Sequence, residues 1–75
     1  MEEILVAEMA GNVWKVEVSA GAEVEEGDVL VILESMKMEI PVESPVSGSV
    51  TSLMVSPGDV VAEDQPLVGV TARAG

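Results

Sequence analysis

The chain has 75 residues, 48% of them apolar, and its 14 acidic and three basic side chains give a formal net charge of −11. This length allows one small domain, expected to span residues 1–75, and so strong a negative charge argues against nucleic acid or an anionic membrane as a partner. The sequence contains no cysteine, histidine or tyrosine, which removes disulfides, Ser-His and Cys-His nucleophile pairs and the commonest zinc ligands. We therefore expect no catalytic residues and no metal site.

The apolar pattern predicts short β-strands separated by turns, because Val, Ile and Leu dominate and Gly and Pro recur roughly every ten residues. The predicted strands, in chain order, are Met1–Met9, Asn12–Val18, Val29–Glu34, Met38–Ser44, Ser49–Val55 and Leu67–Thr71, with brief extended pieces near Val24 and Val61. The acidic start does not fit a secretory signal, and no aliphatic run approaches the roughly 20 residues that span a bilayer, so we expect a cytoplasmic protein. The last four residues, 72–75, are expected to fray.

The second predicted strand begins a segment that occurs twice in the chain. When the sequence is shifted by 37 positions, residues 11–33 match residues 48–70 at 9 of 23 positions without a gap. The chain is therefore interpreted as two copies of one structural unit, residues 1–37 and 38–75. Two similar copies predict two similar sheets that face each other in a small all-β sandwich or barrel.

Two local features recur in both copies. The shared apolar positions, such as Val13, Val16 and Val18, are spaced three and then two apart, which predicts a β-bulge in each strand. Ser56-Pro57-Gly58-Asp59 has Pro and Gly at the central positions of a type II turn, where the second of these needs a positive φ. Gly21 occupies the position of Gly58 in the first copy.

The chain has to reverse between Leu33 and the strand that starts at Met38, and only four residues are available for this reversal. Tight two-residue hairpins favour pairs such as Asn-Gly, which tolerate positive φ. The tip here would be Met36-Lys37, which turn chemistry does not favour. Positions that break local rules are candidate functional sites, although an ordinary solvated hairpin explains the pattern equally well.

The segment Glu34-Ser35-Met36-Lys37-Met38-Glu39 closely resembles the Met-Lys-Met attachment motif of biotinyl domains, the carrier modules of biotin-dependent carboxylases. The upstream Gly-x-Val-x-x-Val-x-Val-x-x-Gly pattern and its second copy are also similar to this family, so the resemblance covers nearly the whole chain. It implies a flattened barrel of two four-stranded antiparallel sheets related by a pseudo-two-fold axis, with the modified lysine at an exposed hairpin between the halves. The chain most resembles the single-domain biotin/lipoyl attachment proteins, with Ser35 standing where the family more often has Ala.

The resemblance implies that a biotin protein ligase joins biotin covalently to Lys37. The chain would then carry carboxylate between biotin carboxylase and carboxyltransferase components, as a carrier rather than an enzyme. Met36 and Met38 would provide adaptable apolar surface for recognition, although filling gaps in the core is their alternative role. A lipoyl carrier, or an acceptor of both biotin and lipoate, is a second interpretation, although lipoyl domains usually carry Asp-Lys-Ala at this place. An unmodified β-sandwich that acts as an interaction module is a third.

The remaining candidate residues have simpler explanations. Lys15 lies inside a predicted strand and is expected on its solvated face. Trp14, the only aromatic residue, is expected to fill the core or cover its rim. The glutamates and aspartate of residues 23–28 lack the spacing of a calcium loop and are expected to form a solubilising acidic turn. Ser35 resembles the phosphopantetheine-bearing serine of acyl carrier proteins, but that serine starts a helix and the flanks here are β-rich.

Overall fold

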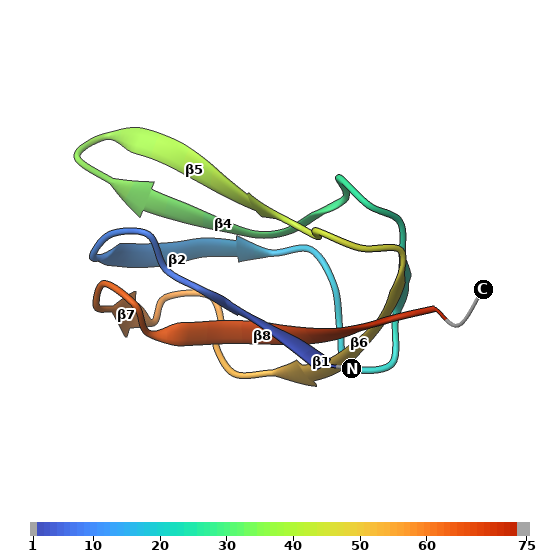
Figure 1. Cartoon of the computed structure of the whole chain (residues 1–75). Coiled ribbons are helices and arrows are strands. Elements are labelled where there is room, and N and C mark those ends of the chain that lie inside the picture. Colours follow the sequence, from blue (N-terminus) through green and yellow to red (C-terminus); the bar gives the residue numbers. More distant parts are fainter. Residues whose placement is uncertain (1, 74–75) are drawn as a thin grey trace.

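The computed structural model describes residues 2–73, which form β-strands and turns without a helix. The strands are β1 (Glu2–Val6), β2 (Gly11–Val16), β3 (Glu23–Val24), β4 (Val29–Ser35), β5 (Met38–Glu43), β6 (Gly48–Leu53), β7 (Val60–Val61) and β8 (Pro66–Ala72) (Figure 1). Within the residues described, no helix is long and apolar enough to cross a membrane.

The strands form two antiparallel sheets of four strands, with the orders β1-β8-β6-β3 and β5-β4-β2-β7. A shift of 37 residues carries β2, β3 and β4 onto β6, β7 and β8, and it converts one sheet order into the other. The expected all-β fold with two sheets related by a pseudo-two-fold axis is therefore confirmed. The molecule is elongated, with principal extents of 39 × 17 × 17 Å.

The bulges and turns lie where the sequence predicts them. The register of β2 against β4 shifts between Val13 and Lys15, and the register of β6 against β8 shifts at the two positions 37 residues later. In the predicted turn, the Asp59 N–H donates to the Ser56 carbonyl at 3.1 Å, and the φ of Gly58 is 95°. The φ of Gly21 is similar, at 92°. Both copies therefore share their bulge and their glycine turn.

The two ends of the described chain differ from the prediction. Strand β1 ends at Val6 rather than Met9, and the next residue, buried Ala7, bonds through its N–H to the Gln65 carbonyl and through its carbonyl to the Asp64 N–H in the turn before β8. The expectation that the chain frays from residue 72 is wrong for residues 72 and 73, since β8 includes the first and the N–H of Arg73 donates to the Ser47 carbonyl at 2.8 Å. Residues 1, 74 and 75, which the predictions also included, lie outside the described part.

The core lies between the sheets and draws on equivalent positions of both halves. Its fully or almost fully buried apolar residues are Ala7, Val13, Val24, Leu30, Val31, Leu33, Val50, Val55, Val61, Leu67, Val68 and Val70. Burial of each Val or Leu side chain stabilises the fold by about 1.5–3 kcal/mol. Of the two places expected for Trp14, the core interior is wrong and a position outside it is what the structure shows: the residue is 44% exposed at the β2 bulge, and the Lys15 Nζ lies 5.2 Å from its ring centroid.

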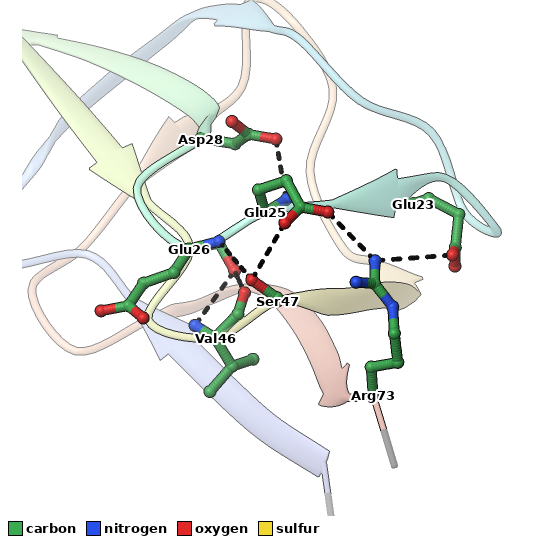
Figure 2. Close-up of polar contacts among 8 residues, drawn as sticks. Glu23, Glu25, Glu26, Asp28, Val46, Ser47 and Arg73 are labelled. Carbon is green, nitrogen blue, oxygen red and sulfur yellow. Dashed lines mark hydrogen bonds and ion pairs between the residues drawn. The ribbon is translucent and has the colours of Figure 1, made fainter. Parts of the chain in front are cut away.

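The acidic turn before β4 has a structural role (Figure 2). The Arg73 guanidinium lies 3.1 Å from Glu25 Oε2 and 3.7 Å from Glu23 Oε1. The Ser47 hydroxyl donates to Glu25 Oε1 at 3.3 Å, and the Glu25 N–H donates to Asp28 Oδ2 at 2.9 Å. These contacts tie the last described residue to the turn, and residues 2–73 hold no cluster of acidic side chains arranged for a metal ion.

Candidate functional site

Strands β4 and β5 are joined by a turn of only two residues. Ser35 lies opposite Met38, so Met36 and Lys37 alone connect the strands. Their φ angles are 53° and 66°, and positive φ at both central residues is the geometry of a type I′ hairpin. This left-handed conformation costs a residue with a side chain about 1–2 kcal/mol. The sequence indicates that Met36 and Lys37 do not suit a tight turn, and the positive φ of both residues shows that their backbone is strained.

The hairpin projects at one end of the elongated molecule, and the start of β1 and the end of β8 lie towards the opposite end (Figure 1). Met36 is 85% exposed, Met38 is 54% exposed and Lys37 is also exposed. The alternative role of the two methionines as core gap fillers is therefore wrong. The structure brings all three residues into one continuous exposed segment.

The surroundings of Lys37 leave its amine facing solvent. Glu34 and Glu39 are exposed and pair across β4 and β5, one position beyond the Ser35–Met38 pair. Among residues 2–73, both ion pairs within 4 Å belong to Arg73, so the amine of Lys37 takes part in neither. Such an amine can be reached by another protein.

The base of the hairpin touches the loop between β1 and β2, a contact that the sequence analysis missed. The Ser35 hydroxyl donates to the Ala10 carbonyl at 3.0 Å. A Cβ at Gly11 would lie 2.6 Å from the Glu34 carbonyl oxygen and 3.3 Å from the Ser35 Cβ, so only glycine permits this approach. The only available sequence signal is the match of Gly11 with Gly48 in the repeat. Ser35 ends a strand and does not begin a helix, unlike an acyl carrier serine.

A small β-sandwich of two similar sheets, with an exposed lysine at the tip of the hairpin that joins its two sequence halves, has the arrangement expected of a carrier domain. Residues 3–70 match the biotin–lipoyl family model, which is described as "Biotin-requiring enzyme". The chain therefore belongs to the biotin–lipoyl family, as its sequence motifs indicate. The group on which this family depends is biotin, in agreement with the cofactor expected from the motif.

Relatives of similar length support this assignment. The chain is 49% identical over 61 residues to the biotin/lipoyl attachment protein of Bacillus subtilis, and the match covers 81% of this chain and 84% of that protein. It is 52% identical over 61 residues to the biotinylated protein TB7.3 homolog of Mycobacterium leprae, covering 81% and 86% of the two chains. Among solved structures, a single-chain, multi-domain long-chain acyl-CoA carboxylase matches 96% of this chain with a TM-score of 0.90 and 36% identity, over 7% of its own length. The same domain therefore occurs both in short proteins and inside a much longer enzyme.

Proposed function

We propose that biotin is joined to Lys37 through an amide bond at Nζ, and that the domain carries carboxylate between biotin carboxylase and carboxyltransferase sites. The observation that carries this proposal is the exposed position of Lys37 at the tip of the hairpin between the two halves. A relative named as a biotinylated protein and the domain of similar structure in an acyl-CoA carboxylase support it. When bound, biotin supplies a ureido nitrogen that accepts and releases carboxylate.

The contribution of the chain to its own modification is limited to presenting the amine. Amide formation joins Nζ to the acyl carbon of biotinyl adenylate, breaks the bond from that carbon to the adenylate oxygen and releases AMP. Because the amide nitrogen formed keeps only one hydrogen, a base has to accept a proton from Nζ. The sequence has no histidine, cysteine or tyrosine to do so. We assign this role to a biotin protein ligase, so the chain is a substrate and a tether rather than an enzyme.

The hairpin also suits the work of a carrier after modification. A tethered group visits partner sites at a high effective concentration, provided that its anchor can reach them. Met36 and Met38 place flexible, polarizable side chains on either side of the anchor, and methionine surfaces adapt to differently shaped pockets. We assign these two residues to recognition by the ligase and by the carboxylase components.

The test is the intact mass of the protein after expression with a biotin protein ligase and biotin. We expect one biotinyl group on the wild type and on the control variant Lys15→Arg, which alters the only other lysine. The variant Lys37→Arg should take up none while remaining folded. A labelled Lys37→Arg variant would show that the attachment site is wrong.

Lipoate is the second candidate group, because the Bacillus subtilis relative is named for both biotin and lipoate. Incubation with a lipoate ligase and lipoate in parallel separates the possibilities by adduct mass. Biotin alone supports the proposed carrier, both adducts support a dual acceptor, and lipoate alone supports a lipoyl carrier. A folded protein that takes up neither group supports the unmodified interaction module.

We further propose that residues 1–75 act as one carrier domain with halves 1–37 and 38–75, working in the cytoplasm. The single hydrophobic core shared by both sheets supports the one-domain interpretation. The 37-residue correspondence of strands supports the division into halves. Limited proteolysis checks the domain assignment, because one compact domain should resist cleavage between its halves.

A further inference from the structure

The contact between the hairpin and the β1–β2 loop has a counterpart in the second half of the molecule. A shift of 37 residues carries Ala10 onto Ser47 and Met36 onto Arg73. In the second half, the Ser47 carbonyl accepts the backbone N–H of Arg73 at 2.8 Å. In the first half, the equivalent carbonyl of Ala10 accepts the side-chain hydroxyl of Ser35 at 3.0 Å. Both halves thus fasten the end of their long strand to the same loop position, but only the first half uses a side chain to do so.

The turn that this contact adjoins is strained. Met36 and Lys37 both adopt positive φ, which is unfavourable for residues that have a side chain. Strained backbone of this kind persists only where contacts with the surrounding structure hold it in place. Ser35 is the strand residue directly before the turn and is half-buried. Its hydroxyl therefore acts at the point where the strained segment begins. The close approach of β2 at Gly11 brings the loop within reach of this hydroxyl.

We propose that Ser35 is a positioning residue, whose hydroxyl fastens the hairpin to the β1–β2 loop and so holds Lys37 in one orientation for the enzyme that modifies it. This inference rests on the proposed attachment at Lys37. Without the hydroxyl, the tip exchanges among several conformations, and only a fraction of the molecules presents the amine correctly. A partner that binds only the competent conformation then binds with an affinity lowered by that fraction, while the chemistry of the bound state is unchanged.

The decisive experiment compares Ser35→Ala with two other variants. Ser35→Thr keeps the hydroxyl, and Ser47→Ala removes a hydroxyl with two hydrogen bonds at the opposite end of the molecule. Initial rates of biotinylation, measured against carrier concentration with a biotin protein ligase, give KM and kcat for each variant. Amide nitrogen relaxation gives order parameters for Met36 and Lys37 in the unmodified proteins.

We expect the KM of Ser35→Ala to exceed that of the wild type by up to about fivefold, the limit set by one typical neutral hydrogen bond, with kcat unchanged. The order parameters of Met36 and Lys37 should fall from the rigid towards the flexible range. Ser35→Thr and Ser47→Ala should match the wild type in both measurements.

Three results would overturn the inference. The first is a Ser35→Ala variant with the KM and order parameters of the wild type. The second is a Ser35→Thr variant that behaves like Ser35→Ala. The third is a fall in kcat at constant KM, which places the loss in the reaction of the bound complex rather than in the presentation of the amine before binding. If the wild type takes up no biotin, the proposed function fails, whereas the order parameters still decide whether Ser35 holds the hairpin.

Discussion

At the tip of the β4–β5 hairpin, two long side chains occupy a backbone conformation that Asn and Gly adopt more readily. Met36 and Lys37 have φ angles of 53° and 66°, and both are exposed, so burial of their side chains does not offset the strain. A residue chosen for the turn would lack the amine. Residues that favour the turn and residues that suit the proposed attachment therefore differ, and this difference concerns only Met36 and Lys37.

Replacement of the tip by the preferred turn pair should stabilise the fold and abolish modification. We expect Met36→Asn combined with Lys37→Gly to raise the free energy of unfolding by about 1–2 kcal/mol, because Asn and Gly tolerate a type I′ turn. For a domain of this size the corresponding rise in Tm is roughly 5–10 °C. Met36→Asn alone should give part of the stabilisation and keep the lysine available for labelling. An unchanged or lower Tm in the double variant would contradict the strain.

The exposed methionines should affect recognition without affecting stability. We expect Met36→Ala and Met38→Ala to raise the KM for the ligase by about threefold to tenfold, within the range of a contact at a protein interface. Their Tm should stay within about 2 °C of the wild type, because exposed side chains contribute little to the core. Met54→Ala is the matched control, since Met54 is 42% exposed and lies outside the hairpin. An equal rise in KM for the control would show that the effect is not specific to the hairpin.

At the scale of strands and turns, glycines serve two different purposes. Gly58 has a φ of 95° and open space on the side where a Cβ would point, so a side chain there meets strain but no neighbour. Gly48 lies in β6, and a Cβ there would overlap the Thr71 carbonyl oxygen of β8. Gly11, the counterpart of Gly48 in the first half, has the looser contact to the Glu34 carbonyl described above. The approach of β6 to β8 at Gly48 is therefore tighter than the approach of β2 to β4 at Gly11. The tighter approach lies in the sheet that does not contain the β4–β5 hairpin.

Alanine substitutions should separate these two effects. We expect Gly58→Ala to lower the free energy of unfolding by about 1 kcal/mol through its positive φ alone. Gly48→Ala should cost about 3 kcal/mol or more, because the backbones of β6 and β8 have to separate to admit the methyl group. Chemical denaturation followed by the fluorescence of Trp14, the only aromatic residue, measures both. Equal losses in the two variants would contradict this distinction.

The same elements show what local sequence can and cannot predict. The Val29–Leu33 run and the three-then-two spacing in β2 and β6 are local patterns, so the strands, their bulges and the two-residue hairpin could all be predicted. The choice between the core and its rim for Trp14 could not, because an aromatic side chain suits both, and the bulge leaves it partly exposed. The contact between Ser35 and Ala10 joins residues 25 positions apart and depends on the register of β2 against β4. No local pattern encodes such a register, and Lys37 as the attachment site stays a prediction.

At the scale of the whole molecule, the two-fold relation places the hairpin at one pole and the start of β1 and the end of β8 at the other. Glu2 pairs with Thr71, so β1 begins beside the end of β8. This junction corresponds, through the 37-residue shift, to the β4–β5 hairpin of the other half. A polypeptide attached at β1 or β8 would therefore leave from the pole far from the β4–β5 hairpin (Figure 1). This geometry explains how one domain fold can present its hairpin equally well alone or inside a longer chain.

Charge is the second property of the whole molecule, and it predicts how salt affects stability and recognition. With a net charge of −11, the folded chain repels itself, and added salt screens this repulsion. We expect Tm to rise by a few degrees between about 0.01 and 0.15 M sodium chloride, as the Debye length falls from about 30 to 8 Å. The ion pairs of Arg73 are largely exposed, so their weakening by salt should not cancel this gain.

The same screening should weaken the encounter with a partner that has a basic surface. We expect the KM for the ligase to increase with salt while kcat stays constant, because rim charges act mainly on association. Glu39→Gln, next to the hairpin, should reduce this salt dependence, whereas Glu26→Gln, at the opposite end of the molecule, should leave it almost unchanged. A KM that is independent of salt, or an equal effect of both variants, would show that the acidic surface around Lys37 serves solubility and not recognition.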